Sequence, residues 1–268
     1  MKRWAGIATW LFLGVACAKV PTHTGTSSWR DTESQAQVQL ELADWHIEND
    51  KTQEAMSILK NLREQGLEGP HIDLLQARAL SKEGLVGSAE PLLYRVIDEL
   101  PRNPQPWATL GVIYADSGRI PEAIDALEKA KGLDESDPDI LNNLGFIYLI
   151  EQRFDDARNV LKEAIGLDGT EPLYRNNLAF ALVGLNEPQE ALRLFRTTGP
   201  EPEARYNLGL AFARIGMNSS ARVQLERAIS LDPEHEKAKT TLDSLVSESG
   251  QEPTSQDESS EDASDESP

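Results

Sequence analysis

The sequence predicts an all-α fold, a solenoid of about six helix–turn–helix repeats with a C-terminal capping helix. Residues 138–164 have the apolar spacing of two short helices, and the same pattern recurs one repeat length before and one repeat length after this stretch. A fixed period of this kind indicates stacked repeats that bury their apolar faces against one another. Small residues recur where paired helices would cross, because a larger side chain there would push the helices apart.

The crossing positions hold only alanine or glycine in all six copies, on the first helix (helix A) and on the second helix (helix B) of each repeat. The copy that starts at residue 104 adds the spacing W-x-x-L-G-x-x-Y…A-x-x-x-L, from Trp107 to Leu127. This pattern resembles the tetratricopeptide repeat (TPR), a unit of about 34 residues, and the resemblance implies a right-handed superhelix. The crossing residues are Ala43, Ala77, Gly111, Gly145, Ala179 and Gly209 in helix A, and Ala55, Ala89, Ala123, Ala157, Ala191 and Ala221 in helix B.

The N-terminal residues are expected to lie outside the repeats. Lys2 and Arg3 precede an apolar run that is too short to span a bilayer, so residues 1–16 are predicted to be a signal peptide. Cys17, the only cysteine, ends the sequence GVAC, which resembles a bacterial lipobox. The resemblance implies a palmitate-bearing lipoprotein anchored through Cys17.

Ala18, the residue after Cys17, indicates in which membrane such a lipoprotein would be anchored. By the habit of that family, Ala18 implies the bacterial outer membrane, and we expect the protein to face the periplasm. Ordinary cleavage after Ala18 is the alternative that these residues leave open. Residues 17–35 are polar and rich in Ser and Thr, and we expect the lipidated cysteine to be followed by a flexible tether there.

The predicted domain boundaries follow the frame of the repeats. The fifth repeat is shorter than the others, because Thr197 to Pro200 ends its helix B early. The cap has apolar residues at helical spacing. Beyond it, residues 249–268 are acidic and Ser-rich with no large apolar residue, which predicts a disordered tail. The expected repeats are 36–69, 70–103, 104–137, 138–171, 172–201 and 202–235, with the cap at 236–248.

The composition argues against several classes of function. A formal net charge of −19 argues against nucleic-acid binding, which needs a basic face. The four histidines are scattered, and no metal-ligand spacing or phosphate loop is present. We therefore expect no enzyme activity, no cofactor, no metal and no small-molecule substrate.

The TPR resemblance implies that helix A lines an inner groove, which identifies candidate binding residues. At the fifth, sixth and ninth positions of helix A, successive repeats carry amides beside apolar side chains. Amides can donate to and accept from a peptide backbone, and aromatic rings supply apolar contact. Two interpretations stay open: the asparagines bind a partner segment, or they join neighbouring repeats. The candidates are Asn142, Asn143, Phe146, Asn176, Asn177, Phe180, Tyr206, Asn207 and Leu210.

The whole layout resembles lipid-anchored TPR proteins of the bacterial envelope. The stretch RNNLAFALVGLNEPQEALRLF, followed by a clipped loop and ARYNLGLAFARIG, resembles the TPR lipoprotein of tight-adherence (Flp) pilus assembly. The type IV pilus pilotin, which assists a secretin, and the TPR lipoprotein that scaffolds peptidoglycan hydrolases are similar. These resemblances imply a membrane-anchored scaffold that binds a secretin or a pilus component. The alternative is an adaptor that recruits or regulates cell-wall enzymes.

Overall fold

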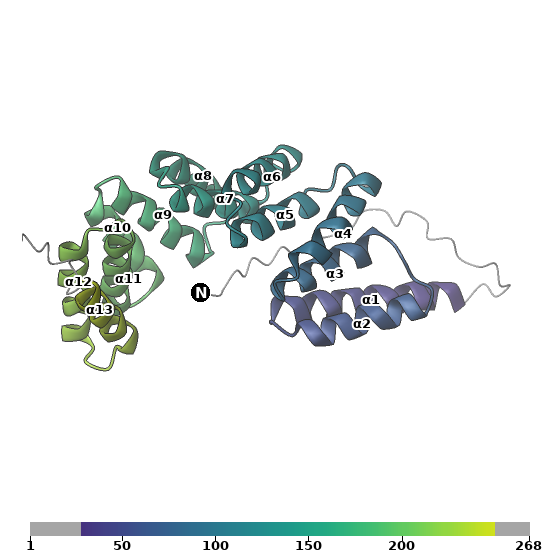
Figure 1. The fold of residues 1–268 in the computed structure, drawn as a ribbon, viewed down its shortest axis with the longest axis horizontal. Coiled ribbons are helices and arrows are strands. Elements are labelled where there is room, and N and C mark those ends of the chain that lie inside the picture. Colours follow the sequence, from purple (N-terminus) through teal and green to yellow (C-terminus); the bar gives the residue numbers. More distant parts are fainter. Residues whose placement is uncertain (1–27, 250–268) are drawn as a thin grey trace, which may run out of the picture. The chain divides into compact units, whose positions relative to one another are not determined.

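The computed structural model describes residues 28–249, and within that range every regular element is an α-helix (Figure 1). This confirms the predicted all-α fold class. The chain divides into two compact units between Ala181 and Leu182, inside α9. The helices are α1 (Ser28–Glu48), α2 (Thr52–Glu64), α3 (Pro70–Lys82), α4 (Val86–Glu99), α5 (Gln105–Asp116), α6 (Ile120–Leu133), α7 (Pro138–Ile150), α8 (Phe154–Leu167), α9 (Pro172–Gly184), α10 (Pro188–Thr198), α11 (Glu201–Arg214), α12 (Asn218–Leu231) and α13 (Glu236–Ser249).

The first unit is a stack of helical hairpins. Each helix A packs against the helix B that follows it, in the pairs α1 with α2, α3 with α4, α5 with α6 and α7 with α8. Neighbouring repeats are joined in two ways. Helix B contacts the next helix A in the pairs α2 with α3, α4 with α5 and α6 with α7, and successive helices A also touch from α1 to α7. This is the packing expected of a repeat solenoid, in which each unit contacts only its neighbours.

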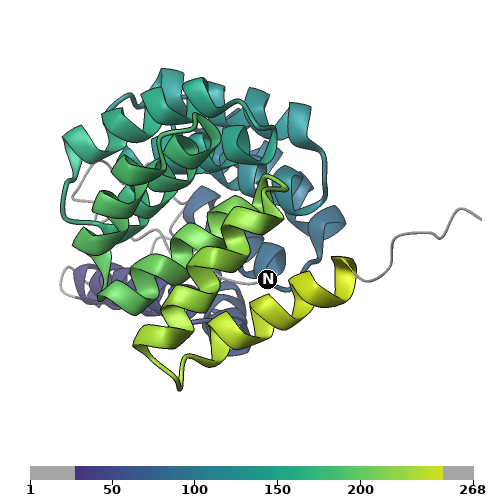
Figure 2. The same cartoon turned by 90° about the vertical axis from the view of Figure 1, so that its left-hand side faces the viewer.

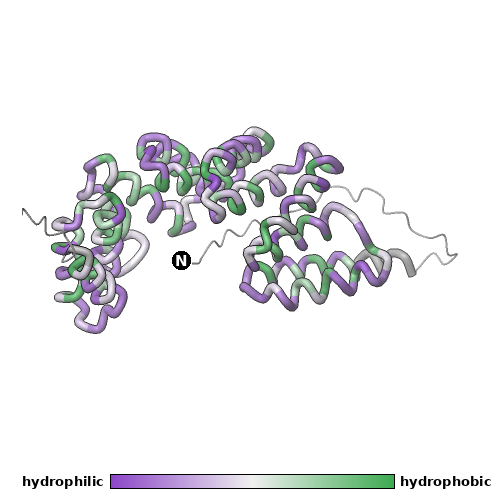
Figure 3. Tube along the Cα trace, in the orientation of Figure 1, coloured by the Kyte–Doolittle hydropathy of each residue, from purple (hydrophilic) through white to green (hydrophobic). Residues whose placement is uncertain are grey.

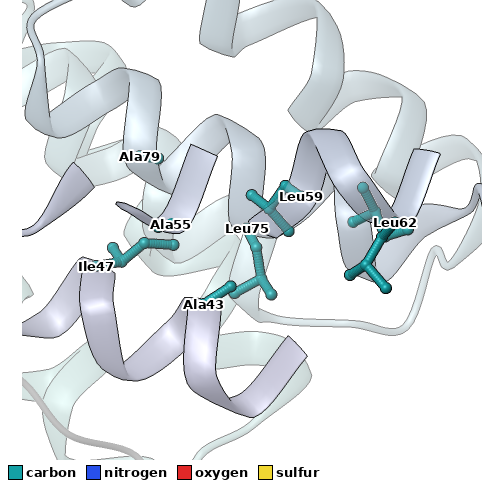
Figure 4. Close-up of a cluster of buried hydrophobic side chains, with 8 residues drawn as sticks. Ala43, Ile47, Ala55, Leu59, Leu62, Leu75 and Ala79 are labelled. Atoms are coloured by element: carbon teal, nitrogen blue, oxygen red, sulfur yellow. The ribbon is translucent and has the colours of Figure 1, made fainter. Parts of the chain in front are cut away.

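The apolar core of the stack begins between α1, α2 and α3. Figure 4 shows side chains from these three helices converging, with Ile47 beside Ala55 and Leu75 beside Ala43. Leu59 and Leu62 of α2 are also fully buried in this cluster. Apolar and polar segments alternate along each helix in Figure 3, as expected for helices that bury one face.

The small residues at the crossing positions have a direct structural reason. A Cβ atom added at Gly145 of α7 would lie 2.6 Å from Cγ of Leu161 of α8, and one added at Gly111 would lie 2.5 Å from Cγ of Leu127. The leucine of helix B therefore occupies the space beside the missing side chain. The helices can approach this closely because glycine places no Cβ atom in the space that the leucine fills.

The turn between helix A and helix B contains one residue with a left-handed backbone in every repeat. Glycine is the usual residue for this conformation, since other residues meet a steric cost there. Successive positions are one full repeat apart until the clipped fifth repeat, after which the step is shorter. The residues are Asp50, Gly84, Gly118, Gln152, Asn186 and Gly216, with φ between 56° and 78°.

The second unit contains α10 to α13. Helix α10 is the shortest helix of the described chain at 11 residues, and it ends at Thr198, where the sequence predicts an early stop. Helix α11 packs against α10, α12 and α13, and α13 runs beside α12 at the yellow end of the chain in Figure 2. The cap helix covers the last apolar face, because Ala238 is buried with Leu225 and Ala228.

The start of α1 corrects one predicted boundary. The helix begins at Ser28, so residues 28–35, which the sequence predicts to be part of the flexible tether, are helical. This segment contains no glycine or proline, and the helix extends through it despite its Ser and Thr content. The predicted signal peptide, Cys17 and the predicted tail from residue 250 to residue 268 lie outside the described residues. No helix between residues 28 and 249 is both long enough and apolar enough to cross a membrane.

Candidate partner-binding surface

Six of the nine predicted groove residues lie in the first unit, on α7 and on the first part of α9. They separate into two groups by burial. Asn142 and Asn177 are buried, with 2% and 7% of their surface exposed. The other four side chains, Asn143, Phe146, Asn176 and Phe180, are half-buried.

The two buried asparagines contact each other. The Nδ2 atom of Asn177 donates a hydrogen bond to Oδ1 of Asn142 over 2.8 Å, in the buried space between α7 and α9. Buried amides need such partners, because an unpaired polar group away from water is costly. This pair therefore joins two neighbouring repeats. The sequence left open whether the asparagines bind a partner or join repeats, and for Asn142 and Asn177 the hydrogen bond favours the second interpretation.

The half-buried side chains form a surface that we call the phenylalanine face, made of Val112, Asn143, Phe146, Asn176 and Phe180. Phe146 comes four residues after Asn142, and Phe180 comes three residues after Asn177. Each ring therefore lies on the same helix face as the buried amide beside it. Val112 of α5 occupies the equivalent position one repeat earlier and is also half-buried. Apolar side chains thus recur at one repeat position on three successive helices A.

The N-terminal turn of α7 is held by two buried or part-buried carboxylates. Asp137 caps the helix by accepting hydrogen bonds from the backbone N–H groups of Asp139, at 2.9 Å, and Ile140, at 3.3 Å. The Tyr174 hydroxyl of α9 donates to Oδ1 of Asp139 over 2.6 Å. The Asp137 cap orders the first turn of α7, and the bond from Tyr174 joins that turn to α9.

Burial changes the acidity of these groups. It raises the pKa of the Asp137 and Asp139 carboxyls, although the hydrogen bonds that they accept oppose the shift. Burial and the bond to Asp139 also raise the pKa of the Tyr174 hydroxyl. Shifted carboxyls can mark functional sites, but each of these has a structural partner, so we interpret them as supports of the helix start.

The remaining three predicted residues, Tyr206, Asn207 and Leu210, lie on α11 in the second unit. All three are half-buried. The Tyr206 ring packs on the His235 ring with 5.1 Å between centroids. His235 is itself buried, and its Nδ1 accepts from the backbone N–H of Ala238 at the start of the cap. The cap therefore holds the Tyr206 side chain in place.

The repeats match known protein families. A profile described as TPR repeat matches residues 111–150, and profiles described as tetratricopeptide repeat match residues 138–171, 172–197 and 202–235. These segments are tetratricopeptide repeats. None of the curated proteins matches the chain.

Solved TPR structures share the fold. The pilF protein of Pseudomonas aeruginosa has 16% sequence identity and a TM-score of 0.60, over 80% of this chain and 99% of its own. YrrB, described as a TPR protein with an unusual peptide-binding site, has 22% identity and a TM-score of 0.52, over 68% and 95%. A thermophilic TPR protein of Thermus thermophilus has 18% identity and a TM-score of 0.50, over 79% and 98%. At these identities the likeness shows the fold alone, an all-α TPR solenoid.

A pocket of about 450 Å³ on α2 and α3 is not predicted by any motif of the sequence. Lys60 and Arg63 lie one helical turn apart on α2 and both line the pocket, and this pair of basic residues is the sequence feature that could have indicated it. Arg63 donates to Asp73, which also accepts from Arg95, so these charges form an ion-pair network. Within residues 28–249 no group of His, Cys, Asp and Glu could hold a metal ion. The pocket is lined by Gln53, Met56, Ser57, Leu59, Lys60, Arg63 and Gln76.

Proposed function

We propose that this protein is a scaffold of the bacterial envelope, anchored at the outer membrane through a lipid on Cys17 and facing the periplasm. In this role the phenylalanine face holds a segment of a protein partner during pilus or secretion-system assembly. The observation that carries the proposal is the repeated, half-buried apolar position at Val112, Phe146 and Phe180. Side chains that recur in register along a stack present one continuous contact surface to an extended segment.

The chemistry of the face favours a peptide without a required charge. Phe146 and Phe180 supply apolar contact area, and the half-buried amides of Asn143 and Asn176 lie one position away from the buried pair. None of these residues is charged. The face therefore suits a segment recognised through its backbone and apolar side chains.

Photo-crosslinking in the native envelope tests the partner. A photoreactive residue placed at Phe146 or Phe180 is expected to give an adduct with a pilus subunit or a secretin, identified by mass spectrometry. The matched probe at Lys162, which is exposed on α8, should not give that adduct. An adduct with a peptidoglycan enzyme would favour the adaptor role, and an adduct from Lys162 alone would contradict the phenylalanine face.

Substitution tests the face itself. We expect Phe146→Glu with Phe180→Glu to abolish partner binding while helical content, measured by circular dichroism, stays unchanged. The control Val223→Glu changes an exposed apolar residue of α12 and should leave binding intact. Loss of helical content in the double variant would mean that the two rings are core residues.

The anchor has its own test. A palmitate analogue fed to the cells should label the wild type, and Cys17→Ser should remove the label and release the protein from the membrane fraction. Release of an unlabelled wild type into the soluble periplasm would favour cleavage after Ala18.

A further inference from the structure

The outer face of α1 carries a stripe of exposed apolar side chains that the solenoid does not use. Val38, Leu42 and Trp45 are 61%, 45% and 49% exposed. We call these three residues the N-terminal stripe. They are separate from the phenylalanine face, which lies on α5, α7 and α9.

The spacing of the stripe is that of a helix that packs on another helix. The three residues are separated by four and then three positions, which is the alternation of apolar residues along a coiled-coil seam. Ala43 and Ile47, which α1 buries against α2 and α3, lie on the opposite side of the helix. Helix α1 therefore has two apolar faces, of which the solenoid covers one.

The stripe differs from the other exposed apolar residues of the described chain. Leu133, Leu167 and Leu231 are each single residues at the end of a helix B, at one repeated position. Scattered exposed residues of that kind are normal on a protein surface. Three large side chains on two successive turns of one helix form a contiguous patch, and such patches mark interaction sites.

The charges beside the stripe indicate what it binds. Glu41 is exposed on one flank of the stripe, and Glu48 follows it on the same flank, half-buried and within electrostatic reach of Arg78 and Lys82 of α3. The flanking positions on the other side hold Gln39 and His46, and the Lys51 ammonium lies 5.1 Å from the centroid of the Trp45 ring. Carboxylates at such flanking positions favour a partner helix with basic residues opposite them, because the two can form ion pairs between the helices.

We propose that the N-terminal stripe docks an amphipathic helix of a second protein, with apolar residues at heptad spacing flanked by Lys or Arg. A second copy of this chain fits less well, because it would present the same carboxylates and the protein carries a net charge of −19. The interaction places a second partner at the N-terminal end of the solenoid. It is independent of what the phenylalanine face holds.

The test uses the full chain and two labelled synthetic peptides of about three heptads each, both with leucine along the seam. One peptide has lysine at the flanking positions and the other has glutamate. Fluorescence anisotropy should show binding of the lysine peptide to the wild type. Leu42→Glu should weaken it between about tenfold and a hundredfold, because a buried leucine contact is lost. The control Val223→Glu, at a single exposed valine, should have no effect.

A charge reversal distinguishes charge-dependent recognition from non-specific apolar association. Glu41→Lys, which reverses the exposed flanking carboxylate, should shift the preference towards the glutamate peptide by up to about tenfold. Equal affinity for both peptides in wild type and variant would overturn the proposal. Sedimentation that shows a wild-type dimer and a Leu42→Glu monomer would assign the stripe to a second copy. Tighter peptide binding after removal of residues 1–27 would assign it to the chain's own leading segment.

Discussion

The side-chain amide of Asn177 donates a hydrogen bond to the side-chain oxygen of Asn142, 2.8 Å away, and both residues are buried between successive helices A. The bond joins the sixth position of one helix A to the fifth position of the helix A before it. The asparagines occur as two adjacent pairs, Asn142 with Asn143 and Asn176 with Asn177, and one residue of each pair lies in the interface between repeats. The other members, Asn143 and Asn176, remain half-buried.

This pairing predicts a non-additive effect on stability. Asn142→Leu or Asn177→Leu alone should lower the free energy of unfolding by about 1–3 kcal/mol, because the remaining buried amide loses its partner. The double variant should cost less than the sum, since no unpaired amide is left. Chemical denaturation of the four proteins measures the coupling. Asn143→Ala is the control and should change stability by no more than about 0.5 kcal/mol, and strictly additive effects would contradict the pairing.

The sequence predicts the repeat stack well because its signals are local and periodic. The crossing position is visible as a series of alanines and glycines that recur once in every repeat, and the structure gives the reason in the contact between Gly145 and Leu161. The early end of α10 is similarly visible as Gly199 and Pro200. Each of these features is a backbone or volume requirement that few residue types satisfy.

Other features were harder to predict because they depend on a partner distant in sequence or on context. The burial of Asn142 follows from its contact with Asn177 in the next repeat, and composition alone does not distinguish it from Asn143. The left-handed turn is visible at Gly118 but not at Gln152, where an ordinary residue accepts the same backbone. The start of α1 at Ser28 was missed because Ser and Thr are typical of tethers as well as of helix ends.

The turn at Gln152 predicts a stabilising substitution. Its φ of 56° carries a steric cost for a residue with a Cβ atom, whereas Gly118 holds the same turn position one repeat earlier with φ of 73°. Gln152→Gly should therefore raise the free energy of unfolding by up to about 1 kcal/mol, after the entropy cost of glycine is subtracted. Thermal unfolding followed by circular dichroism measures the change.

The reciprocal variant is the control for that turn. Gly118→Ala puts a Cβ atom on the same left-handed backbone and should destabilise the protein by about 1 kcal/mol or more. The added atom would have nothing within 4 Å, so a clash is not the cause. Equal stability of Gly118→Ala and wild type would show that the turn relaxes without cost.

The close approach of α7 and α8 predicts the effect of one added methyl group. In Gly145→Ala the new Cβ would lie 2.6 Å from Cγ of Leu161, so the helices must separate or the leucine must leave its rotamer. We expect a loss of about 1–3 kcal/mol in the free energy of unfolding by denaturant. Gly166→Ala in α8 is the control, because its Cβ would meet nothing within 4 Å. It should be neutral or stabilising by up to about 1 kcal/mol, and a similar loss in both variants would contradict the clash.

Glu201 at the start of α11 predicts a pH-dependent contribution to stability. Its carboxylate accepts from Arg196 Nε at 2.6 Å and from Arg205 Nε at 2.8 Å, and these bonds lower its pKa to about 2. A lowered pKa in the folded state means that the ionised form stabilises the fold. This stabilisation is fully present above the ordinary value of 4.5 and is lost as the pH falls towards 2.

We therefore expect Glu201→Gln to unfold at a lower temperature than the wild type near pH 7, by an amount equivalent to less than about 1 kcal/mol, because the pair is partly exposed. The difference between the two melting temperatures should shrink as the pH falls from 4.5 towards 2, because the wild-type carboxylate then begins to be protonated in the folded state as well. Glu226→Gln, which removes a single exposed ion pair with Arg222, should give a smaller gap at pH 7. A gap for Glu201→Gln that stays constant across this pH range would show that the carboxylate's charge does not stabilise α11.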